Sequence, residues 1–232
     1  MNIAPFLARA FQELDKSMQG TLTGTKIEGI TETISHYALA SAVASMAMAV
    51  IPGAGGVAAA LAQAGFVWAT YIKINNHLGI SMSKDTAKFL GNAIATNIVT
   101  QFGAILAGHV LAGVLALIPI VGSVGAALAE AAIGYSLIYA AAYIYMKLVS
   151  RVIKPDGSVQ VADEDSTRAI IENILKCEDM RGLFKESAKQ FKEAKSNGDL
   201  DNAKKELNCP NCGTPYSSED HFCSVCGHNL NN

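Results

Sequence analysis

The 232-residue sequence predicts an all-α protein built mainly from two Ala/Gly-rich helical hairpins, with amphipathic helices and a small metal-binding segment after them. Three observations predict this fold. Half of the residues are hydrophobic but only 7% are aromatic, so Ala, Val, Ile and Leu supply most of the apolar content. Residues 37–149 carry few charges and lack the apolar–polar alternation of half-buried strands. Within this region one turn sequence occurs twice, flanked each time by long apolar runs.

Residues 1–30 are predicted to form a short amphipathic helix followed by a linker. Arg9, Glu13 and Asp15 interrupt the stretch in which a secretory signal peptide needs unbroken apolar residues. We therefore expect a protein that is not secreted. The net charge of −2 gives no overall attraction to nucleic acid or to an anionic surface.

Residues 31–154 are predicted to form a duplicated hairpin domain. Judged by run length, its four helices cover about 31–51, 56–77, 86–118 and 124–150. The sequence IPGAGGVAAALAQA begins at Ile51, and IPIVGSVGAALAEA begins 67 positions later at Ile118, with nine of fourteen positions identical. Because two unrelated Ala-rich helices would rarely share Ile-Pro and the glycine after it, we interpret the segments as an internal repeat.

The turns of the two hairpins are predicted from proline and glycine. Pro52 and Pro119 disfavour helical geometry in the residue before them and cannot continue the preceding hydrogen-bond ladder. Gly55 and Gly122 allow a sharp reversal of the chain. Each repeat is therefore expected to be a helical hairpin with a tight, uncharged tip.

The Ile-Pro-x-x-Gly turns at 51–55 and 118–122, together with the Ala-rich helices after them, resemble a family of bacterial helical domains. That family often accompanies Era-like GTPases and is commonly described as membrane-associated, and the resemblance covers residues 36–150. It implies a membrane-associated body. It also implies a GTPase partner on a separate chain, because this sequence contains no GxxxxGK[ST] motif of its own.

Residues 155–208 are strongly charged and are predicted to form one or two amphipathic helices that break near Gly182. These helices would lie on the hairpin domain or on a partner. Cys177 is expected to be a packed thiol in the first of them. Asn197-Gly198 should end the pattern, and a short final helix should lead to the C-terminal segment.

Residues 209–232 contain two CxxC pairs separated by ten residues, each followed by glycine. Zinc prefers four soft ligands in a tetrahedron, and two intervening residues let one tight turn point both sulfurs at the metal. We expect one structural zinc ion, with no catalytic role, bound by Cys209, Cys212, Cys223 and Cys226. The segment resembles the zinc-ribbon domains that bacterial proteins carry at one terminus. Two disulfides or redox-active CxxC motifs are the alternative.

The C-terminal segment is not expected to bind nucleic acid. It contains no Lys or Arg, and Glu219 and Asp220 lie between its two cysteine pairs. Contacts to phosphate supply most of the non-specific affinity of nucleic-acid-binding proteins, and this segment has no cation to make them. A protein-binding or purely structural role is expected instead.

No motif in the sequence indicates an enzyme. The GxGxxA pattern at residues 53–58 lacks the preceding strand and the acidic residue that a dinucleotide site needs, and HExxH and GxSxG are absent. Four polar residues interrupt otherwise apolar helices and are candidates for a polar core. They are either functional, or hydrogen-bonded between helices, or at edge positions that face water. They are Gln63, Gln101, His109 and Glu130.

The sequence thus predicts a non-enzymatic adaptor or assembly protein of the cytoplasmic membrane that recruits a protein partner. Uncharged hairpin tips and Lys or Arg at the opposite helix ends place both termini and the cysteine segment in the cytosol. Two alternatives remain open: a soluble cytoplasmic helical bundle that binds other proteins, and a membrane-perturbing protein that inserts its hairpins conditionally. A homo-oligomer is compatible with each of them.

Overall fold

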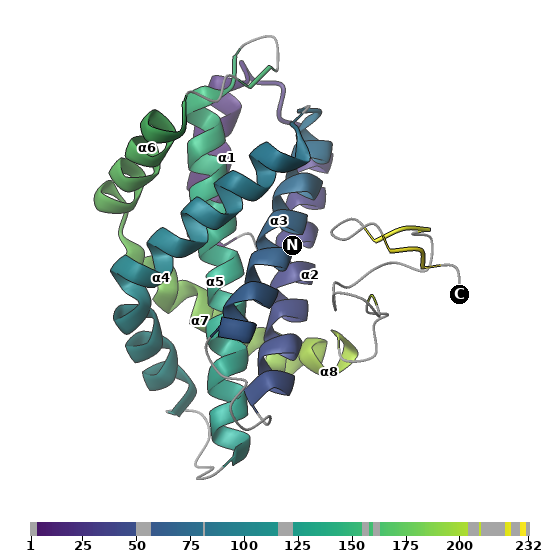
Figure 1. Cartoon of the computed structure of the whole chain (residues 1–232), viewed down its shortest axis with the longest axis vertical. Coiled ribbons are helices and arrows are strands. Elements are labelled where there is room, and N and C mark those ends of the chain that lie inside the picture. The colour runs from purple at the N-terminus through teal and green to yellow at the C-terminus, as the bar shows by residue number, and fades with distance from the viewer. Residues whose placement is uncertain are drawn as a thin grey trace.

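The computed structural model describes the helical body and parts of the C-terminal segment. The residues described are 4–49, 57–80, 82–115, 123–154, 158–159, 163–203, 209, 221–223 and 228–230. Apart from two isolated β-bridges, every regular element in these ranges is a helix (Figure 1). The all-α prediction is confirmed.

Four long helices form the body: α2 (Gly24–Ala49), α3 (Val57–Leu78), α4 (Lys84–Leu115) and α5 (Ser123–Val152). They correspond to the four predicted helices, and the largest difference is at the start of α2. Thr23 explains this early start, because its carbonyl oxygen accepts from the Ile27 amide (3.1 Å) and its hydroxyl from the Lys26 amide (3.4 Å). The predicted boundary at residue 30 therefore lies inside a helix.

The two predicted turns fall outside the described residues, and so do Pro52, Gly55, Pro119 and Gly122. The structure does show where the flanking helices stop. α2 and α4 end at Ala49 and Leu115, and α3 and α5 begin at Val57 and Ser123. α2 contacts α3, and α4 contacts α5, as in two hairpins. A common origin of the two pairs stays a prediction.

Helix α5 is the centre of the bundle. It contacts α1, α2, α3, α4, α6 and α7, and every residue from Gly134 to Val149 is buried. Within the described residues, one candidate membrane span is found, Ala127–Val152, and 89% of its most apolar window is covered by protein. A long apolar helix that is mostly covered by protein has the properties of the core helix of a bundle.

Helix α1 (Pro5–Ser17) packs on α5 through one face. Proline at the first helical position suits a helix start, because its missing amide hydrogen would have no helical partner there. The buried residues Leu7, Ala10, Phe11 and Leu14 follow the spacing of an apolar helix face. The N-terminal amphipathic helix is therefore part of the body.

Three further helices cover the body: α6 (Glu164–Cys177), α7 (Met180–Asn197) and α8 (Asp199–Ala203). The predicted break near Gly182 lies instead at residues 178–179. Asp179 caps α7 by accepting from the Gly182 amide (2.9 Å), and a Cβ at residue 182 would collide with that carboxylate. Gly182 thus belongs to the first turn of α7. At the other end, Gly198 closes α7 in the left-handed conformation (φ 84°), as predicted.

Cys177 is exposed, which contradicts the prediction of a packed thiol. It follows the buried Leu175 by two residues, which is about 200° around a helix. The side chain therefore points away from the face that α6 packs on the body.

Candidate functional site

Two of the four predicted zinc ligands are described, and both are buried. Cys209 is 2% exposed and Cys223 is 3% exposed. An antiparallel bridge joins Phe222 to Asn229. Two backbone hydrogen bonds flank it. The Cys223 amide donates to the His228 carbonyl oxygen (2.8 Å), and the Leu230 amide donates to the His221 carbonyl oxygen (2.9 Å). Residues 221–223 and 228–230 therefore run antiparallel, and in the sequence the second cysteine of the pair lies between them.

Cys212 and Cys226 lie outside the described residues, so the geometry of the complete ligand set is not shown. The described part contains no group of three or more His, Cys, Asp or Glu side chains that could hold a metal ion. The donor chemistry nevertheless fits zinc, because four thiolates form a closed tetrahedral shell that keeps no position for substrate. Cys209, Cys212, Cys223 and Cys226 are the residues that would hold the ion.

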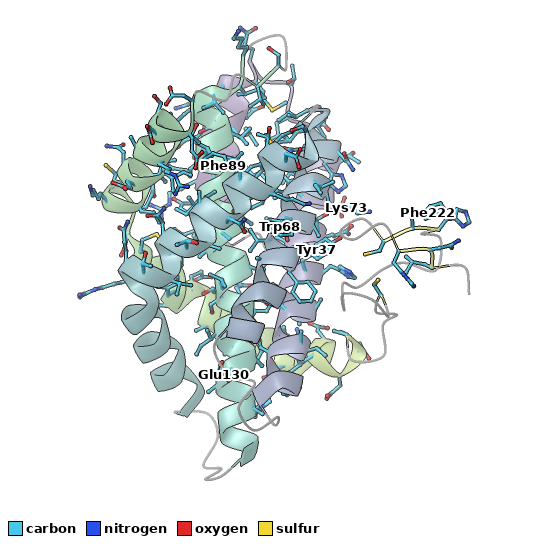
Figure 2. All side chains as sticks on the ribbon, in the orientation of Figure 1. Tyr37, Trp68, Lys73, Phe89, Glu130 and Phe222 are labelled. Atoms are coloured by element: carbon cyan, nitrogen blue, oxygen red, sulfur yellow. The ribbon has the colours of Figure 1, made fainter. Side chains whose placement is uncertain are left out.

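Three other residues of this segment differ in their exposure to solvent. His221 is exposed and His228 is half-buried. Phe222, which Figure 2 shows beside the helical body, is 62% exposed although it is one of the few large apolar residues of the segment. An aromatic side chain left in water contributes little to folding, so this one is available for contacts with other molecules.

Comparison with known proteins identifies this segment. Residues 208–230 match the zinc-ribbon domain. The matched range contains both CxxC pairs, which supports the expectation of a structural zinc ion in the ribbon. No curated protein and no solved structure matches the chain. The comparisons give no support to the resemblance between residues 36–150 and the GTPase-associated helical family.

The four candidates for a polar core are not brought together by the described residues. Gln101 is exposed, and its side-chain amide donates to Asn97 on the preceding turn (3.0 Å). Glu130 is exposed on α5 (Figure 2). Both residues therefore occupy positions that face water, the second of the two non-functional alternatives. The side chains of Gln63 and His109 lie outside the described residues.

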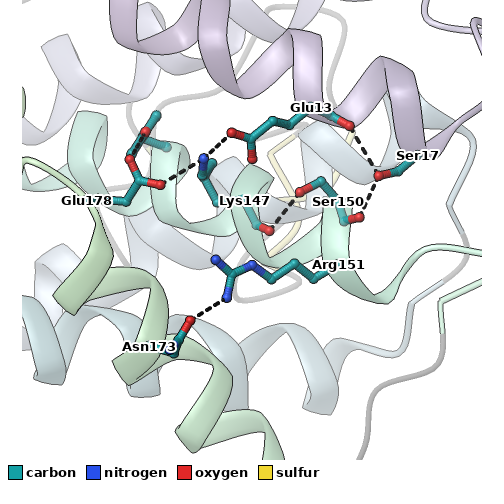
Figure 3. A network of polar contacts seen from close by, with 8 residues as sticks. Glu13, Ser17, Lys147, Ser150, Arg151, Asn173 and Glu178 are labelled. Carbon is teal, nitrogen blue, oxygen red and sulfur yellow. Dashed lines mark hydrogen bonds and ion pairs between the residues drawn. The ribbon is translucent and has the colours of Figure 1, made fainter.

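Sequence reasoning missed a polar network that the structure does bury. Lys147 of α5 is 6% exposed and forms ion pairs with Glu178 (2.8 Å) and with Glu13 of α1 (Figure 3). The hydroxyl of Tyr143 also donates to Glu178, which lies at the junction of α6 and α7. We call these four residues the Lys147 network; it ties α1 and the junction of α6 and α7 to α5.

The charge state of the Lys147 network follows from its hydrogen bonds. Burial raises the pKa of Glu178, but the hydrogen bonds from Lys147 and Tyr143 and the positive charge of Lys147 outweigh it and hold the pKa below its ordinary value. Burial, reinforced by Glu178, raises the pKa of Tyr143. The carboxylate is therefore ionised and the phenol neutral near pH 7, an arrangement that stabilises the packing of α1 rather than supplying a reactive group.

Two further hydrogen bonds near the Lys147 network join α5 to α1 and to α6 (Figure 3). Ser17 at the end of α1 donates to the Ser150 carbonyl oxygen (2.6 Å), and Arg151 donates to Asn173 of α6 (3.0 Å). One sequence signal could have indicated the network: Lys147 is the only charged residue between Glu130 and Arg151. A single lysine inside a long apolar run needs a partner when it is buried.

Proposed function

We propose that the chain is a non-enzymatic adaptor or assembly protein that contacts a membrane with one end of its helical body and binds a protein through its zinc ribbon. The observation that carries the membrane contact is the distribution of charge. No Asp, Glu, Lys or Arg occurs between Glu32 and Lys73, or between Lys88 and Glu130. These stretches include the ends of α2 and α4 and the beginnings of α3 and α5.

The arrangement of the helices brings these uncharged ends together. The direction of the chain alternates from α2 to α5, so the four ends lie toward the same side of the body, the lower one in Figure 1. The charged helices α1 and α6 lie toward the opposite side. A charged side chain at the centre of the hydrocarbon costs about 3 kcal/mol, so an end without charges is the part of the body that can enter a membrane.

The burial of α5 favours a second candidate, a soluble helical bundle that binds other proteins. Because 89% of the most apolar window of α5 is covered by protein, little of that window is left to face lipid. In this candidate the uncharged ends pack only against each other.

Liposome flotation distinguishes the two candidates. The wild-type protein should float with vesicles of neutral and anionic phospholipid. The double variant A54E/V121E should remain at the bottom, because it places one charge in each of the two uncharged stretches of the sequence. Ala169→Glu on the exposed face of α6 is the matched control and should still float. Wild-type protein that stays at the bottom would favour the soluble bundle.

For the zinc ribbon, Phe222 supports a protein partner. Exposed aromatic residues are frequent anchors of protein interfaces. The ribbon contains no Lys or Arg, and Glu219 and Asp220 precede Phe222 closely in the sequence. These features fit a partner with an apolar pocket bordered by Lys or Arg, and they disfavour nucleic acid. A separate GTPase, the partner that the family resemblance implies, is the candidate for this role.

Crosslinking in cells tests the role of the ribbon. Phe222→Ala should lose the specific crosslinked partner while keeping its zinc, since the side chain is exposed. Val99→Ala is the matched control, because Val99 is also an exposed apolar residue (52%) but lies on α4. Equal crosslinking by the Phe222 and Val99 variants would argue against an anchor at Phe222.

A further inference from the structure

A cavity of about 490 Å³ opens in the helical body, and none of the four residues of the Lys147 network lines it. Residues of α1, α2, α5, α7 and α8 line it. Its volume falls in the range of small-molecule sites, which are concave, largely apolar and supplied with a few polar groups. Neither the membrane contact nor the zinc ribbon of the proposed function uses this cavity, so a ligand bound there would have a separate role.

The floor of the cavity is apolar and aromatic. Leu7, Ile34, Tyr135 and Tyr139 line it and are all buried. The rings of Tyr135 and Tyr139 lie one helical turn apart on α5, with centroids 6.4 Å apart and an interplanar angle of 17°. Two nearly parallel phenol rings offer a π surface that attracts cations as well as apolar groups.

The charged groups on the rim are acidic. Glu32 of α2 and Asp199 of α8 line the cavity, and no Lys or Arg is among its described lining residues. Neither carboxylate forms an ion pair with a described cation. A cationic ligand would therefore meet two carboxylates without having to displace a lysine or arginine in that part of the chain.

The pKa values of the two tyrosines are raised by the nearby acidic side chains as well as by burial. Burial raises the pKa of Tyr135, and the negative charges of Asp199 and Glu193 raise it further. Burial, Tyr135 and Glu186 likewise raise the pKa of Tyr139. Both side chains are neutral near pH 7. The Tyr139 hydroxyl is buried and has no hydrogen-bond partner among the described residues, which is costly for a polar group.

We propose that this cavity is a binding site for a small organic cation, an amine or guanidinium compound with an apolar portion. The apolar portion lies on the floor formed by Tyr135 and Tyr139, and the cationic group lies between Glu32 and Asp199. Polar side chains around the rim, including His36, Gln190 and Asn202, supply additional hydrogen-bonding groups.

Calorimetric titration of the full-length protein tests the site with butylguanidinium as the probe and butylurea as its neutral counterpart of nearly the same shape. Butylguanidinium should bind saturably at millimolar concentration and butylurea should not. Glu32→Gln and Asp199→Asn should each weaken binding about two- to fivefold, and the double variant about tenfold, because each removes one charge pair. Glu28→Gln, one helical turn before Glu32 and exposed, is the matched control and should bind like the wild type.

The result that would overturn the proposal is the absence of saturable butylguanidinium binding by the folded wild-type protein. Equal binding of butylurea would also overturn it, as would a double variant with the affinity of the wild type. Circular dichroism of each variant checks that the helices are intact.

Discussion

At the scale of single residues, Lys147 has the clearest consequences. It is nearly fully buried, and its partners Glu178 and Glu13 come from distant parts of the chain. Removing one partner of a buried ion pair leaves an uncompensated charge. Lys147→Ala is therefore expected to lower the free energy of unfolding by about 3 kcal/mol in urea titrations. Arg168→Ala, which breaks an exposed pair with Glu164, should cost less than about 1 kcal/mol; equal losses would contradict the network.

Glu178 predicts how stability depends on pH. Its pKa is lowered in the folded protein, so its contribution is complete above the unfolded value of about 4.3 and is lost as the pH falls through the lower folded value. The free energy of unfolding should therefore decrease below about pH 4.3, and Glu178→Gln should make that decrease shallower. Glu164→Gln, at an exposed site on α6, is the control and should keep the wild-type slope.

Helices α3 and α4 approach closely at Gly91, and the fluorescence of the only tryptophan, Trp68, can report this contact. A Cβ at Gly91 on α4 would overlap the ring of Trp68 on α3. Gly91→Val is expected to displace the indole toward solvent, shift its fluorescence to the red and destabilise the protein by about 1–3 kcal/mol. The neighbouring Asn92 is exposed, so Asn92→Val should leave the emission unchanged. An unshifted spectrum for the Gly91 variant would contradict the helix contact.

At the scale of helices, run length and composition were enough to predict where the long helices lie. They could not predict where α6 ends and α7 begins, because Gly182 looks like a helix breaker in sequence. In the structure the absence of its Cβ lets Asp179 cap α7.

Asp179→Ala should therefore destabilise the protein by about 1 kcal/mol, measured by thermal unfolding. Glu193→Ala on the exposed face of α7 should have a smaller effect, and the reverse order would contradict the cap.

The docking of α1 and the Lys147 network could not be predicted either. Both depend on which distant helices meet, and a residue pattern within one helix does not contain that information. Which alternative holds for Gln101 and Glu130 likewise depends on neighbouring helices, which cover their helices only partly at those positions. The zinc-ribbon segment was predictable because the spacing of its cysteines is local.

At the scale of the whole molecule, stability has two separate sources. The helical body is held by its apolar core around α5, whereas a ribbon of this size has little core and depends on its metal. Loss of zinc should therefore unfold the ribbon and leave the body intact. In the proposed function, the same separation would let the ribbon bind a partner without disturbing the end of the body that we propose contacts a membrane.

Metal analysis combined with far-ultraviolet circular dichroism tests this separation most directly. Freshly purified, reduced protein should contain one zinc ion per chain, and Cys209→Ser should lose it while keeping nearly all of the helical signal. Cys177→Ser, which changes an exposed thiol outside the ribbon, should keep the zinc. Protein without zinc, or a Cys209 variant whose helical signal collapses with the metal, would contradict two independent sources of stability.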